Sequence, residues 1–126
     1  MPKTLPPFFW PIGTGAEPTS PPPAGRQVLG HDGTAYFVVL ADGSVASVDP
    51  LNALSTRFVN SSPHQLFGCL EALAERTAQL ERSRHDEAVI AVSELRHDLN
   101  RFDIAALGDR DNWWAVVLDH LEDSLP

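Results

Sequence analysis

The chain contains residue types that catalyse reactions and bind metals, but their spacing follows no catalytic or metal-ligand pattern. No histidine lies at a zinc-ligand spacing from another histidine or from the single cysteine. His64 and Cys69 are five residues apart, which does not place them on one face of a helix. Cys69 lies inside an apolar helical pattern, and this predicts a small buried residue. The histidines are His31, His64, His85, His97 and His120. We therefore expect no metal, no cofactor and no catalytic residue.

Carboxylates are so numerous that no acid–base pair can be singled out. The pairs Glu71/Glu75 and Glu94/Asp98 are each four residues apart in helical patterns. Like charges at this spacing destabilise a helix by roughly 0.2–0.5 kcal/mol per pair. A cationic partner facing these acids would offset the repulsion. A solvated helix face explains the same pattern if nearby arginines neutralise it, and both explanations remain open. The arginines in question are Arg76, Arg96 and Arg101.

A tandem of tryptophans near the end of the chain is the other candidate for partner contact. Adjacent helical residues point about 100° apart, so we expect one of Trp113 and Trp114 in the core and the other at an edge. An edge tryptophan suits either the N-terminal aromatic residues or a partner. Charge and helical placement together give one candidate set of partner-binding residues. The set is Glu71, Glu75, Asp109, Asp111, Trp114, Asp119, Glu122 and Asp123.

The charge of the chain is strongly lopsided. Its 126 residues include nine basic and seventeen acidic side chains, a net charge of −8. Residues 62–126 hold six of the basic and thirteen of the acidic ones, so the second half carries most of the negative field. Such a surface repels nucleic acid and anionic membranes and favours basic partners, although acidity also serves solubility. With one cysteine and no long apolar run, the chain is expected to be cytoplasmic.

Two regions differ in composition. Residues 1–25 hold eight of the eleven prolines and should form an extended, irregular arm. Within the arm, Phe8, Phe9 and Trp10 are too apolar to remain in water, so we expect them to dock on the rest of the chain. Residues 26–126 should form a single domain, because this length suffices for a hydrophobic core.

Within this domain, the apolar pattern changes from strands to helices along the chain. Short strands are predicted at residues 28–29, 35–40, 44–48 and 56–59, with Asp42-Gly43 as a tight hairpin turn. A helix follows from Pro63 to about Arg84, opened by a Ser62–Gln65 capping box. Further helices start near residue 86 and near residue 109 or 111, with a capped turn at 103–108 between them. The fold class is therefore α+β, an antiparallel sheet of three to five strands packed against C-terminal helices.

Several short motifs, in this order, resemble those of the SUKH superfamily of immunity proteins, in its fourth subgroup. The stretch Arg57–Phe67, containing FVNSS, looks like the family's junction between a strand and a helix. The turns at residues 30–33 and 40–45 resemble its GxDG and DGxV features. The Asp103–Leu107 turn and the tryptophan opening the last helix are also similar. The resemblance covers roughly residues 28–125 and carries over no functional residue firmly.

This resemblance implies a SUKH-like fold and an antidote that binds and neutralises a cognate polymorphic toxin. Toxins of this kind are often nucleases or nucleic-acid deaminases, and a basic one would suit the acidic chain. The resemblance implies binding by occlusion, without catalysis, direct nucleic-acid contact or membrane contact. A non-catalytic regulatory or scaffolding module is the alternative, since some members of the superfamily have that role. An enzyme would require a deep pocket with two perturbed titratable groups. The sequence does not predict the oligomeric state.

Overall fold

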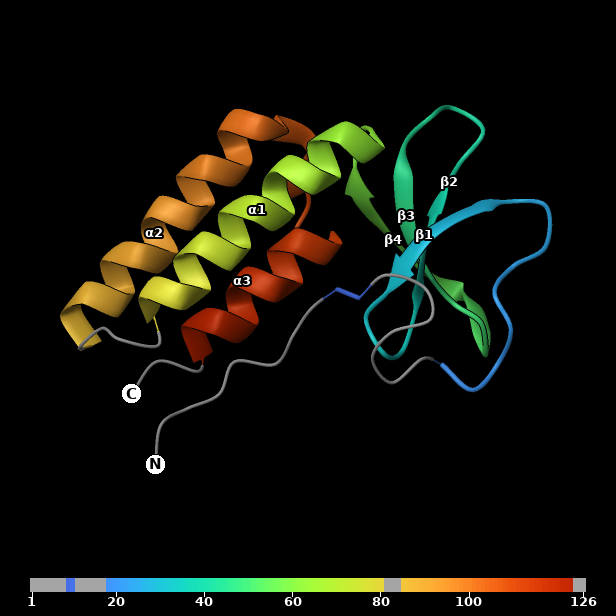
Figure 1. Ribbon diagram of the computed structural model, residues 1–126, viewed down its shortest axis with the longest axis horizontal. Coiled ribbons are helices and arrows are strands. Elements are labelled where there is room, and N and C mark those ends of the chain that lie inside the picture. Colours follow the sequence, from blue (N-terminus) through green and yellow to red (C-terminus); the bar gives the residue numbers. More distant parts are fainter. Residues whose placement is uncertain (1–8, 11–17, 81–84, 124–126) are drawn as a thin grey trace.

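The computed structural model describes residues 9–10, 18–80 and 85–123, and shows an antiparallel sheet followed by helices (Figure 1). The strands are β1 (Gln27–His31), β2 (Tyr36–Val39), β3 (Val45–Asp49) and β4 (Asn52–Asn60). They pair in sequence order, each antiparallel to the next. The helices are α1 (Pro63–Leu80), α2 (His85–Phe102), the single turn η1 (Ile104–Leu107) and α3 (Trp113–Asp123). The predicted α+β class is confirmed.

Short polar turns fix the order of the strands. In the turn between β2 and β3, Gly43 has a φ of +88°, a conformation that glycine adopts without steric penalty. The Asp42 carboxylate accepts hydrogen bonds from the Ser44 hydroxyl at 2.6 Å and the Ser44 N–H at 3.0 Å. These bonds to Ser44 hold the pKa of Asp42 below its usual value. The predicted Asp42-Gly43 hairpin is therefore confirmed.

The helices cover one side of the sheet, and the main core lies between the two layers (Figure 1). The sheet contributes Phe37, Val45 and Val59 to this core. The fully buried helical side chains include Leu66, Leu95, Leu99, Trp114 and Leu118. Burying a leucine in this way stabilises the fold by about 1.5–3 kcal/mol relative to exposing it. In the described part of the chain, no helix has both the length and the apolar character to cross a membrane.

Several element boundaries differ from the sequence prediction or lie outside the described residues. Strand β4 extends four residues upstream of the predicted 56–59, because Asp49 pairs with Asn52 across a tight turn. Helix α1 ends at Leu80, and its predicted last turn to residue 84 falls on residues that are not described. Helix α3 starts at Trp113, so a start at 109 or 111 was wrong. The reason is local, since the Asp109 carboxylate accepts the Asp111 N–H at 2.8 Å and closes a turn.

The expected docking of the N-terminal aromatic residues is confirmed for Phe9 and Trp10, while Phe8 lies outside the described residues. The Trp10 N–H donates to the His31 carbonyl at 2.8 Å, and the His31 N–H donates to the Trp10 carbonyl at 3.0 Å. The Trp10 ring stacks on the buried His31 ring with 5.5 Å between centroids. Phe9 stacks on Phe37 at 5.2 Å. The arm therefore contributes side chains to the core and a backbone contact to the edge of β1.

Candidate partner-binding surface

Seven of the eight candidate partner-binding residues are exposed, on three parts of the helical layer. Two lie on α1, two lie in the turn between η1 and α3, and three lie on α3 itself. The turn is tied to the sheet because Arg57 Nη1 donates to the Asp111 carbonyl at 2.6 Å. In chain order, the exposed residues are Glu71, Glu75, Asp109, Asp111, Asp119, Glu122 and Asp123.

Contacts within the protein distinguish among these acids. Glu122 forms an ion pair with Arg96 of α2. The Asp109 carboxylate closes the turn before α3. Among the acids of α1 and α3 in the part of the chain that the structure describes, Glu71, Glu75, Asp119 and Asp123 have no ion-pair partner. We call these four the unpaired acids, and their full charge is open to a partner.

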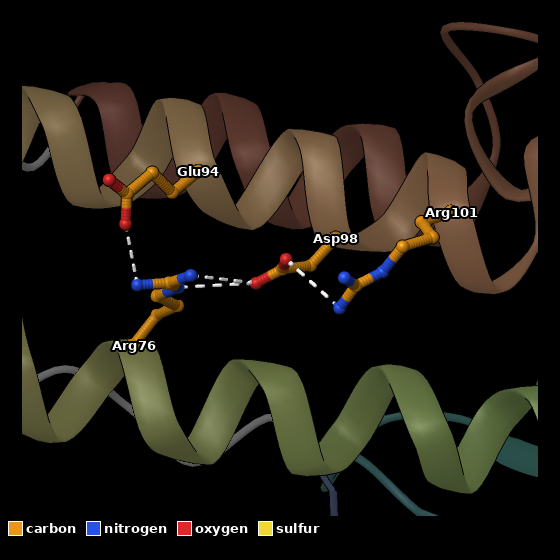
Figure 2. Close-up of polar contacts among 4 residues, drawn as sticks. All are labelled: Arg76, Glu94, Asp98 and Arg101. Carbon is orange, nitrogen blue, oxygen red and sulfur yellow. Dashed lines mark hydrogen bonds and ion pairs between the residues drawn. The ribbon is translucent and has the colours of Figure 1, made fainter.

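The other predicted pair of like charges, Glu94 and Asp98, is neutralised within the protein (Figure 2). Arg76 reaches across from α1 and places Nη1 at 2.6 Å from Glu94 Oε2. Its Nη2 lies 3.1 Å from Asp98 Oδ2, and its Nε donates to the same oxygen at 3.2 Å. Arg101 lies 3.5 Å from the second Asp98 oxygen. Neutralisation by arginines therefore applies to Glu94/Asp98, whereas Glu71/Glu75 lie exposed to solvent without an ion-pair partner.

Trp114 does not belong to an exposed binding surface. Its side chain is fully buried, and its Nε1 donates to Asn60 Oδ1 at 2.8 Å. Trp113 is buried as well, packing edge-on against Phe37 and donating to Asp32 Oδ2 at 3.1 Å. The expectation that one tryptophan would lie at an edge was wrong. The two rings point in different directions from α3, but other parts of the protein pack against α3 in both directions, so both rings are buried.

Asn60, the last residue of β4, is the centre of a buried polar network. Its Nδ2 donates to Asp103 Oδ2 at 2.9 Å and approaches Cys69 Sγ at 3.5 Å. The other Asp103 oxygen accepts the Ser61 hydroxyl at 2.8 Å. The network joins β4, α1, η1 and α3. Its signal in the sequence was a polar residue directly after an apolar strand, within the FVNSS motif.

The neighbouring residues open α1 as predicted. Ser62 Oγ accepts the Gln65 N–H at 3.2 Å and donates to Gln65 Oε1 at 2.9 Å, so the capping contact is confirmed. Gln65 Nε2 also donates to the Phe102 carbonyl at the end of α2. The ring of Phe102, which is 40% exposed, lies against Gly68 of α1. These contacts are structural.

Three features of the described residues bear on a catalytic role: a buried thiol, the grouping of metal-binding side chains and a surface hollow. Burial raises the pKa of the Cys69 thiol to about 11, with Asn60 opposing the shift and Asp103 adding to it. At neutral pH the thiol is therefore protonated, which disfavours a nucleophilic role. No three His, Cys, Asp or Glu side chains in the described segments gather as metal ligands. A shallow hollow of about 210 Å³ near Ser20 and Leu51 contains one carboxylate, Asp49.

Comparison with known protein families identifies a match over most of the chain. The family model described as SUKH-4 immunity protein matches residues 8–120. The chain belongs to the SUKH-4 immunity protein family. The match begins twenty residues earlier than the resemblance read from the motifs, so it includes Phe9 and Trp10. No curated protein and no solved structure matches this SUKH-4 chain.

Proposed function

We propose that this SUKH-4 protein neutralises a cognate toxin by binding it and covering its active surface. Membership of an immunity protein family is the observation that carries the proposal. The toxin we propose is basic, a nuclease or a nucleic-acid deaminase, because enzymes that hold phosphates are commonly basic and this chain is acidic. The proposed mechanism is occlusion in the cytoplasm, without catalysis, a cofactor, a metal or direct nucleic-acid contact.

The unpaired acids are the proposed source of electrostatic steering. Since Glu71, Glu75, Asp119 and Asp123 have no internal cation among the described residues, they attract an external one at full strength. Electrostatic steering raises association rates above about 10⁵–10⁶ per molar per second and weakens as salt is added. Asp109, Asp111 and Glu122 are also exposed but remain secondary candidates. Asp109 and Glu122 each have a local contact, and Asp111 lies in the turn before α3, where its backbone carbonyl accepts a hydrogen bond from Arg57.

An affinity pull-down from the native host, followed by mass spectrometry, tests the proposal. Recovery of one basic nuclease or deaminase domain at near-equal stoichiometry supports neutralisation, and its open reading frame should lie beside that of this chain. Recovery of several unrelated cellular proteins would instead favour a regulatory or scaffolding module. Recovery of no specific partner contradicts the proposal.

Once a partner is recovered, charge variants test the proposed surface. Glu71→Gln with Glu75→Gln should slow association with the recovered domain about tenfold at low salt, with little change in dissociation. A matched control, Gln27→Lys with Leu51→Lys, changes the net charge equally at exposed positions of the sheet half. Equal slowing by both variants would show that only net charge matters, and the assignment to α1 would be wrong.

A further inference from the structure

The outward side of α2 carries a row of exposed residues that no other element covers in the described structure. They follow a spacing of four, three, four and three residues, which is the seam spacing of two packed helices. Ile90 is 56% exposed, and its neighbour Val89 is 45% exposed. Neither residue contributes to the core, whose α2 members lie on the opposite side of the helix. The row is Asp86, Ile90, Ser93, His97 and Asn100, and we call it the α2 seam.

Internal ion pairs neutralise both flanks of the α2 seam. On one flank Glu94 is paired with Arg76 of α1, and on the other Arg96 is paired with Glu122 of α3. Between its ends the seam itself holds no carboxylate, lysine or arginine. In a chain of net charge −8, most surfaces of two copies repel each other. The α2 seam is a part of the helical layer where that repulsion is small and exposed apolar area is available.

The two ends of α2 carry opposite charges that complement each other under two-fold symmetry. Asp86 lies in the first turn, and Arg101 lies in the last turn with its side chain 66% exposed. Arg101 touches Asp98 through one nitrogen at 3.5 Å, and a guanidinium has five N–H donors, so further contacts are available. In an antiparallel pairing of two identical helices about residue 93, Asp86 of one copy meets the Asn100–Arg101 end of the other.

We propose that the α2 seam binds a second copy of this chain in an antiparallel, two-fold dimer. Ile90 of each copy then packs beside His97 of the other, and Ser93 lies at the crossing point, where its small side chain permits close approach. Each contact occurs twice, as a two-fold interface requires. Antiparallel pairing also places the positive N-terminal end of each helix near the negative C-terminal end of the other. This inference is independent of the toxin.

Sedimentation velocity of the full chain over a dilution series tests the proposal. The wild type should show a concentration-dependent change from monomer to dimer. Ile90→Glu should weaken dimerisation at least about a hundredfold, because it places a charge in the apolar contact twice. Leu51→Glu is the matched control, since Leu51 is 78% exposed in the turn between β3 and β4, in the sheet layer rather than on a helix. It should dimerise as the wild type does, and circular dichroism should show both variants folded.

A charge exchange makes the test specific to the antiparallel arrangement. Asp86→Arg alone and Arg101→Asp alone should each weaken dimerisation about tenfold, and the double variant should restore it. A chain that stays monomeric at every concentration overturns the proposal and leaves the seam to a different partner. A dimer that tolerates Ile90→Glu, or a charge exchange that fails to restore dimerisation, also overturns it.

Discussion

The docking of the arm against Gly30 leads to a direct prediction about the core. A Cβ atom at Gly30 would lie 2.4 Å from Phe9 Cζ and 2.5 Å from the Trp10 carbonyl oxygen. Real Cβ atoms do not approach so closely, and the carbonyl is backbone, so it cannot rotate away as a flexible side chain can. Gly30→Ala should therefore displace Phe9 and Trp10 from β1 while the remaining sheet stays paired.

The contacts of the arm set the magnitude of this effect. Displacement loses two backbone hydrogen bonds, each contributing about 1 kcal/mol, and two ring contacts of about 1 kcal/mol each. Released residues regain conformational entropy of roughly 1–2 kcal/mol apiece. The expected net loss of stability is therefore at most about 2 kcal/mol. If the sheet yielded instead, overpacking would cost about 1–3 kcal/mol. The total stability therefore does not distinguish the two outcomes.

Two further measurements distinguish them. If the arm leaves, the amide of His31 loses its acceptor, the Trp10 carbonyl, and should exchange with solvent much faster than amides between β2 and β3. In a double-mutant cycle measured by urea unfolding, Phe9→Ala should lower stability in the wild type but have little further effect beside Gly30→Ala. Additive losses together with a protected His31 amide would refute the reasoning.

Gly68→Ala is the control for adding a methyl group to a glycine. Its Cβ would lie 3.1 Å from Phe102 Cδ1, and this half-exposed ring can shift by a few tenths of an ångström. Alanine also favours the helix over glycine by up to about 1 kcal/mol. The variant should be neutral or slightly more stable by urea unfolding, with the His31 amide still protected.

Three further outcomes follow from the polar contacts. Asn60→Ala should lower the free energy of unfolding by about 3 kcal/mol in urea, because it leaves the Trp114 N–H and the Asp103 carboxylate without a buried partner. Because burial raises the pKa of Cys69 in the folded state, the free energy of unfolding should keep its full contribution from the neutral thiol below pH 9. It should fall by up to about 3 kcal/mol as the pH rises toward 11. Cys69→Ala lacks the thiol, so its free energy of unfolding should not fall from this cause. Arg76→Met should destabilise the fold by about 1–2 kcal/mol, because Asp98 is mostly buried, and a loss under 0.5 kcal/mol would contradict that view of the cluster.

Much of the fold could be predicted because its signals are local. The hairpin at Asp42-Gly43 depends on a positive φ and on hydrogen bonds between neighbours. The start of α1 depends on Ser62 and Gln65, three residues apart. The errors at helix α3 arose where two local signals competed, since Asp109 can cap a helix or close a turn. The boundary between arm and domain at residue 25 stays a prediction, although Trp10 lies against His31.

The candidate surface was predictable only in outline. Helical periodicity and charge were enough to place the five acids of α1 and α3 at the exterior, because exposure follows from the face of a helix. Which acids have internal partners depended on tertiary packing. Arg76 meets Asp98 across 22 residues of chain, and Trp114 meets Asn60 across 54. The sequence by itself determined the elements, their order and the excess of negative charge, since these depend on neighbours and composition. Tertiary structure alone decided that both tryptophans are buried and which carboxylates stay unpaired, because those outcomes depend on contacts between distant segments.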